Sequence, residues 1–184
     1  MTLLDTLREI RDEPWLPVTT AKLGACSGLF AILFLTLMVD RDGFVVLLDS
    51  ANLAFHEAGH PILGLLGPTL GLYGGTLMQL AVPLLVVGSF WRQRHAASVA
   101  VTGVWFFENL LNVARYMADA RVRILPLAGG GEHDWFHIFL RWGVLDLDTT
   151  IASVVRGFGW LGMVATWAWL AWRWRADEAR RRTA

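Results

Sequence analysis

Long apolar runs separated by short polar turns make up most of this chain. Residues 23–39, 76–91, 96–118 and 151–172 are almost uninterrupted apolar stretches, and residues 44–66 form a fifth run with polar residues inside it. A helix needs about 20 mainly apolar residues to cross the roughly 30 Å hydrocarbon core of a bilayer. The pattern therefore predicts an all-α integral membrane protein, a bundle of about five transmembrane helices.

The segments outside these runs have patterns of their own. Residues 1–22 place leucines and an isoleucine on one helical side and charges on the other, which predicts an N-terminal interfacial helix. Glycines crowd residues 64–75, which favours a re-entrant or irregular segment over a regular helix. Residues 135–145 have the spacing of a short amphipathic helix at the interface. We therefore expect an interfacial segment (1–22), one transmembrane domain (23–172) and a basic tail (173–184).

Composition agrees with a membrane location. The chain of 184 residues is 55 % hydrophobic, contains ten tryptophans, and carries sixteen basic and sixteen acidic residues, so no excess of positive charge points to nucleic acid. The single cysteine, Cys26, excludes an internal disulfide and a cysteine-based zinc cage. Tryptophans followed by arginines after residue 172 predict a cytoplasmic C-terminus in a bacterial inner membrane. Counting back over five spans then places the N-terminus outside.

One polar stripe runs along the second apolar segment. Asp49, Asn52, His56 and His60 follow at spacings of three, four and four, so they share a helix face. The last two belong to the sequence His56-Glu57-Ala-Gly-His60, an H-E-x-x-H pattern in which both imidazoles can hold one metal ion and the glutamate can act on a metal-bound water. Charged and strongly polar groups at membrane depth cost about 2–3 kcal/mol each, and a bound cation offsets that cost.

A third metal ligand is needed, because catalytic zinc sites usually have three protein ligands. Asn109, Asn112, Tyr116 and Asp119 share one face of the fourth span, whereas Glu108 and Arg115 lie on neighbouring faces, where they can neutralise each other. The second and fourth spans run parallel if the third crosses, so Asp119 approaches the same membrane face as the histidine pair. The loop that follows adds three more candidates, which are Glu132, His133 and Asp134.

His56-Glu57-Ala58-Gly59-His60 followed by Gly64 inside an apolar helix resembles the signature of the site-2 protease family of intramembrane zinc metalloproteases. The resemblance covers the second to fourth spans and suggests a divergent, minimal member. It implies Zn²⁺ bound by His56 and His60, with Asp119 as the third ligand and Asn112 as the preceding asparagine. The family's aspartate is normally followed by glycine. Here Ala120 follows, so His133, Asp134 and Glu132 remain alternatives.

The expected function is zinc-dependent hydrolysis of peptide bonds in membrane-anchored substrates. Glu57 would be the general base, and Asn112, Tyr116 or Arg121 would supply a hydrogen bond to the developing oxyanion. Expected partners are membrane lipids, the membrane-anchored peptide or protein substrate, and an accessory protein for substrate recognition. Two alternatives remain: a metal-dependent hydrolase acting on a lipid or lipid-linked substrate, and a non-catalytic metal-binding membrane scaffold.

Overall fold

The structure is a computed structural model that describes residues 13–39, 43–127 and 131–183. Within these ranges the regular structure is entirely helical, which confirms the predicted all-α class. The elements, in chain order, are α2 (Thr20–Val39), α3 (Val46–Gly64), α4 (Pro68–Arg92), α5 (Ala96–Ala118), α6 (Asp134–Trp142), the 3₁₀ turn η2 (Leu145–Leu147) and α7 (Asp148–Thr183). Most of the predicted N-terminal interfacial helix falls on residues 1–12, which lie outside the described ranges.

In the residues that the structure describes, four helical segments are long and apolar enough to cross a membrane. They are α2, α4, α5 and the segment 145–183 that contains α7. The helix α3 is not among them, because the polar stripe that carries the histidines lowers the hydropathy of its 19 residues. The described residues therefore contain four candidate spans and one polar helix, and the prediction of about five spans is not confirmed.

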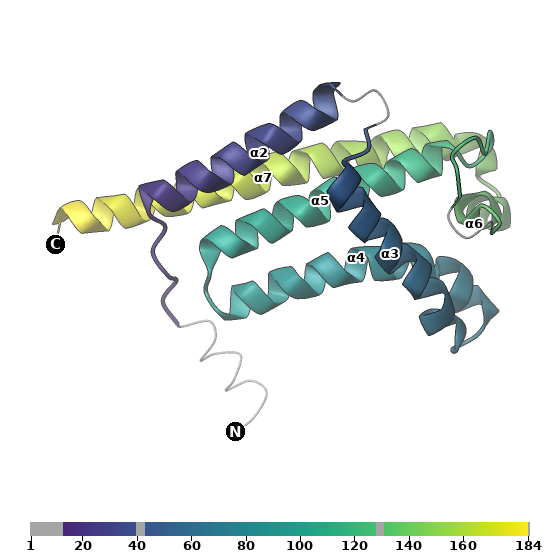
Figure 1. The fold of residues 1–184 in the computed structure, drawn as a ribbon, viewed down its shortest axis with the longest axis horizontal. Helices are drawn as coiled ribbons and strands as arrows, with labels where there is room; N and C mark the ends of the chain where they lie inside the picture. Colours follow the sequence, from purple (N-terminus) through teal and green to yellow (C-terminus); the bar gives the residue numbers. More distant parts are fainter. Residues whose placement is uncertain (1–12, 40–42, 128–130, 184) are drawn as a thin grey trace.

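The four long helices lie alongside one another in alternating directions (Figure 1). The helix α5 packs between α7 and α4, and α2 lies against α7 and α5. The helix α3 crosses α4 at an angle, and α6 sits at the end of the bundle where α4 begins and α5 ends. Val18, just before α2, donates its backbone N–H to Asp177 near the end of α7 at 2.9 Å. Val18 and the last part of α7 therefore lie at the same end of the bundle, and the side of the membrane on which each terminus lies stays a prediction.

The glycine-rich stretch is helical, so the predicted re-entrant segment is not found. The helix α3 ends at Gly64, a tight turn follows, and α4 begins at Pro68 and continues unbroken to Arg92. Gly67 in the turn has φ of +122°, which L side chains rarely adopt. Further along, a Cβ on Gly59 would overlap the backbone of Gly74. The glycines thus allow the backbones of α3 and α4 to contact each other. From the sequence alone, the same glycines predicted an irregular segment.

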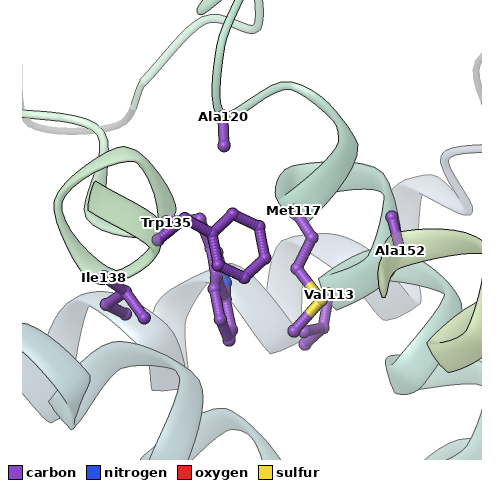
Figure 2. Packing of buried hydrophobic residues seen from close by; sticks show 7 residues of the cluster. Val113, Met117, Ala120, Trp135, Ile138 and Ala152 are labelled. Atoms are coloured by element: carbon purple, nitrogen blue, oxygen red, sulfur yellow. The ribbon is translucent and has the colours of Figure 1, made fainter. Parts of the chain in front are cut away.

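The short helix α6 is held by an apolar cluster at the end of the bundle. Figure 2 shows the cluster, which joins α5, α6 and α7 through Val113, Met117, Ala120, Trp135, Ile138, Phe139 and Ala152. Ile138 and Phe139 are fully buried. Burying a large apolar side chain stabilises by about 1.5–3 kcal/mol. Because these anchors lie one turn beyond Asp134, they fix the position of that residue on the end of α5.

Candidate metal centre

The two histidines of α3 present one ring nitrogen each to a common point. His60 Nδ1 lies 2.9 Å from the backbone carbonyl oxygen of Gly71. A carbonyl oxygen only accepts hydrogen bonds, so Nδ1 of His60 carries the proton and its Nε2 keeps a lone pair. His56 Nδ1 lies 3.0 Å from Oε1 of Gln79 in α4. In the neutral ring, Nδ1 of His56 then donates its proton to Gln79 Oε1, and Nε2 of His56 keeps a lone pair.

The orientation of the Gln79 amide is set by two asparagines of α5. Gln79 Nε2 donates to Oδ1 of Asn109 at 2.6 Å and to Oδ1 of Asn112 at 2.9 Å. Asn109 in turn donates its Nδ2 to the backbone carbonyl of Gln79 at 2.6 Å, which fixes its own amide. With both hydrogens of the Gln79 amide used, only Oε1 faces His56. This buried amide network therefore selects one tautomer of His56 and aims its Nε2, as carboxylates and carbonyls do for many metal-binding histidines.

Asp134, the first residue of α6, completes the group. Its Oδ2 lies 2.9 Å from His56 Nε2 and 3.2 Å from His60 Nε2. Tyr116 of α5 holds this aspartate, because the Asp134 backbone N–H donates to the tyrosine hydroxyl at 3.0 Å and that hydroxyl lies 3.5 Å from Oδ2. With both imidazoles neutral, two nitrogen lone pairs and a carboxylate oxygen thus meet. These three acceptors repel one another unless a metal ion lies among them or a ring takes up a second proton and donates it to Asp134.

The spacing of these three atoms suits a metal ion. Ligand atoms of His56, His60 and Asp134 all lie within 4.8 Å of one another. Two ligands at about 2.0–2.1 Å from a tetrahedral zinc are about 3.3 Å apart, close to the two nitrogen–oxygen distances found here. Two imidazoles and one carboxylate are a donor set of catalytic zinc sites, which keep a fourth position open. The residues present therefore fit Zn²⁺.

Gly75 of α4 leaves the space in which the ion would lie. A Cβ at this position would come 2.5 Å from His56 Nε2 and 2.6 Å from His60 Nε2. Both distances are far shorter than an ordinary van der Waals contact. Any residue larger than glycine would therefore displace the two rings from their common point.

Asp119 and His133, the two leading candidates for the third ligand, pair with each other instead. Asp119 caps the loop after α5, accepting the backbone N–H of Ile124 and of Leu125 at 3.0 Å each. His133 Nε2 lies 3.4 Å from Asp119 Oδ2, and its Nδ1 accepts the backbone N–H of Phe136. Burial lowers the pKa of His133 below its usual value, against the opposing effect of the Asp119 carboxylate. The structure thus brings Asp134, and neither of these residues, to the histidine pair.

The metal group lies in a cleft of about 910 Å³ between α3, α4, α5, α6 and the loop before α6. This volume is in the upper range of small-molecule sites. Glu57 is exposed on α3 and lines the cleft, as Asn112 does. The Oδ1 of Asn112 accepts from Gln79, so its Nδ2 donor is turned away from that bond. Glu132 also lines the cleft but is 84 % exposed and pairs with His137 at 2.7 Å.

Arg121, the third candidate for stabilising the oxyanion, lies outside the cleft. Its side chain binds Asp148 at the start of α7 at 2.7 and 2.8 Å. That pair joins the loop after α5 to α7, and the carboxylate raises the pKa of the exposed guanidinium above its usual value. Asn112 and Tyr116 remain as donors near the histidines.

Asp49 and Asn52, the N-terminal members of the polar stripe on α3, belong to a buried cluster that is separate from the group of His56, His60 and Asp134. Asn52 donates to Asp49 at 3.3 Å and lies 3.5 Å from Glu108 of α5, and Trp105 donates to Asn52 at 2.8 Å. The predicted pairing of Glu108 with Arg115 is not found, because the Arg115 guanidinium lies 5.5 Å from the ring of Phe44 instead. This cluster ties α3 to α5 and orients the helix that carries the histidines.

Comparisons of the chain with models of known protein families, with curated proteins and with solved structures each give no match. Sequence reasoning missed Gln79 and Gly75 as parts of the site. From the sequence, Gln79 favours a helix-to-helix hydrogen bond over a catalytic role, and Gly75 belongs to the glycine-rich stretch that is expected to be irregular. Their spacing of four residues in one helix was the available signal, and it was hidden by the assumption that the glycine-rich stretch was irregular.

Proposed function

We propose that this protein is a zinc-dependent membrane hydrolase that cuts peptide bonds in membrane-anchored segments. One observation carries the proposal: His56 Nε2 and His60 Nε2 converge on Asp134 Oδ2 at 2.9 and 3.2 Å, while Nδ1 of each ring faces an acceptor outside the cluster. With both imidazoles neutral, this cluster gathers acceptors only, whereas a structural cluster would alternate donors and acceptors. The nearby glutamate and amide donor favour catalysis over a purely structural ion.

Bound zinc would supply polarisation of the scissile carbonyl and a more acidic water. His56, His60 and Asp134 would hold it. Gln79 would keep His56 in place, and Tyr116 would keep Asp134 in place. Glu57 lines the cleft beside His56, where its carboxylate accepts the proton of the attacking water and returns it to the leaving amine. The unused Nδ2 of Asn112 is the donor that best fits the developing oxyanion.

The surroundings of the cleft suggest the substrate. Its lining mixes apolar side chains such as Phe44, Leu53 and Leu125 with the polar groups of the metal site. The cleft also lies at the end of helices that are apolar enough to span a bilayer. An unwound peptide segment at the membrane boundary, with apolar side chains and exposed backbone carbonyls, matches both properties.

The direct test compares two glutamates of one cleft. We expect Glu57→Gln to keep about one zinc per chain and to lose hydrolysis of labelled transmembrane peptides by at least about 100-fold, because the general base is removed. Glu132→Gln changes a carboxylate of the same cleft that is exposed and away from the histidines, so it should retain both zinc and activity. Measurements are metal content by mass spectrometry and peptide cleavage in detergent micelles or vesicles.

Other results would redirect or refute the proposal. Loss of zinc in Glu57→Gln would make Glu57 a ligand and remove its role as base. Cleavage of labelled phospholipids, with peptides left intact, would show that the substrate is a lipid and not a peptide. Zinc binding without turnover of either substrate, and with the Glu57→Gln protein fully functional in cells, would leave a metal-binding scaffold.

A further inference from the structure

The two ends of the bundle differ in their basic residues. One end is formed by the start of α2, the turn between α4 and α5, and the end of α7. In the described parts of the chain it carries eight lysines and arginines, which are Lys22, Arg92, Arg94, Arg173, Arg175 and the three arginines at 180–182. The opposite end, which holds the metal cleft, carries four in its loops, short helix and last turn of α5: Arg115, Arg121, Arg123 and Arg141.

Aromatic packing strengthens the distinction. At the basic end Trp15 packs edge-on against Trp91 and Trp169, with ring centroids 4.9 and 5.4 Å away. The guanidinium groups of Arg94 and Arg173 each lie 5.0 Å from the Trp15 ring. Tryptophans with arginines at the end of apolar helices are typical of the boundary between hydrocarbon and lipid headgroups. This tryptophan–arginine cluster marks a membrane surface.

We infer that the basic end lies in the cytoplasmic leaflet, among anionic lipid headgroups, and that the metal cleft opens on the opposite, extracytoplasmic side. Short loops rich in Lys and Arg remain on the cytoplasmic side during insertion. Each basic residue near the anionic surface adds to the electrostatic attraction that holds this end there. Four spans bring the start of α2 and the end of α7 to that surface, in agreement with the hydrogen bond between Val18 and Asp177.

The consequence for substrates rests on the proposed function. The histidines lie late in α3, Asn112 and Asp134 lie near the cleft end of the bundle, and Gln79 lies about halfway along α4 at the inner side of the site. A peptide bond that reaches them must therefore unwind near the extracytoplasmic boundary. The substrate class is thus membrane-anchored proteins with a cleavable segment on that side, and not those whose labile segment faces the cytoplasm.

Thiol labelling of the full-length protein tests the orientation. Cys26 is the only cysteine, so Cys26→Ala provides a cysteine-free background. One new cysteine replaces Val122, which is 64 % exposed after α5, and another, in a second variant, replaces Thr183 at the end of α7. In spheroplasts a membrane-impermeant maleimide should label Val122→Cys at least about tenfold more than Thr183→Cys, and both equally after detergent is added. Preferential labelling of Thr183→Cys, or equal labelling of both before detergent, would overturn the inference.

A pair of reporters separates this inference from the proposed function. Each is a single-span protein with the same unwound segment, placed near the extracytoplasmic face in one and near the cytoplasmic face in the other. We expect cleavage of the first only, dependent on Glu57. Cleavage of the second only would overturn the assignment of substrate class. If neither is cut while the labelling is as expected, the orientation holds and peptide hydrolysis is refuted.

Discussion

Two groups of histidine and aspartate lie close together in this protein, and they are built differently. In the first, Asp119 accepts two backbone N–H groups, and His133 accepts the N–H of Phe136 through Nδ1. The proton of neutral His133 is therefore on Nε2, facing the Asp119 carboxylate at 3.4 Å. In the second, Nδ1 of His56 and of His60 faces an acceptor outside the cluster, and Nε2 of each ring faces Asp134, as a lone pair when the ring is neutral.

The difference suggests how a structural pair can be distinguished from a candidate metal centre when residue types are the same. In the Asp119 group the carboxylate accepts two backbone N–H groups, so it serves as a capping device for the loop after α5, while His133 Nε2 makes no hydrogen bond. In the Asp134 group neutral imidazoles present acceptors to an acceptor, an arrangement that the proposed zinc ion would complete. Changing the residues of each group in matched ways tests this distinction.

The largest effect is expected from Asp134→Asn, which is nearly isosteric but removes the negative charge. Mutations of residues that orient a metal ligand lower metal affinity by about 10–100-fold. Because Asp134 is itself the proposed ligand, we expect a larger loss of zinc affinity here, together with loss of peptide cleavage. Equilibrium dialysis of purified protein against buffered zinc measures the affinity. Unchanged zinc binding would show that Asp134 is not a ligand and that the comparison above is wrong.

Gly75→Ala is expected to have the next largest effect. Its methyl group would lie 2.5–2.6 Å from both Nε2 atoms, so the rings must separate and zinc affinity should fall at least about tenfold. The control is Gly88→Ala in the same helix, where a methyl group meets nothing within 4 Å. That variant should bind zinc normally and gain about 0.5–1 kcal/mol of stability from helix propensity. Equal zinc affinity in both alanine variants would contradict the proposed position of the ion.

Gln79→Leu should have a moderate effect, because it leaves all three ligands in place. Without the Oε1 acceptor, His56 can adopt the other tautomer, and we expect zinc affinity to fall about 10–100-fold. Gln93→Leu, at the exposed end of the same helix, is the control and should leave affinity unchanged. If Gln79→Leu binds zinc as tightly as the unchanged protein, the amide network holds helices together and does not orient the ligand.

The smallest effect on the metal is expected from Asp119→Asn. The amide keeps one acceptor for the two backbone N–H groups, so stability should fall by about 1–3 kcal/mol while zinc content stays near one per chain. Thermal unfolding followed by circular dichroism, together with metal analysis, measures both quantities. Loss of zinc without a change in stability would restore Asp119 as the third ligand.

Several features of the fold could be predicted from local patterns. Apolar runs predicted α2, α5 and the apolar part of α7. Amphipathic spacing predicted a short helix over residues 135–145, which corresponds to α6 in the structure. The structure of a segment was predicted wrongly where its composition suggests an irregular chain but its packing against another helix keeps it regular. Glycine between residues 64 and 75 suggested an irregular chain, but here the missing side chains allow α3 and α4 to pack closely. A helix-packing role for glycine becomes visible only once the partner helix is known.

The sequence by itself determined which helices are apolar enough to cross a membrane and the placement of His56, Glu57 and His60 on one helix turn, because hydropathy and helical spacing are properties of neighbouring residues. Only the tertiary structure decided that Asp134, and not Asp119 or His133, meets the two imidazoles. That choice depends on α6 packing onto the end of α5 through Trp135, Ile138 and Phe139. It also depends on which side chains accept the ring hydrogens. Contacts between distant segments set both, and spacing along the chain does not record them.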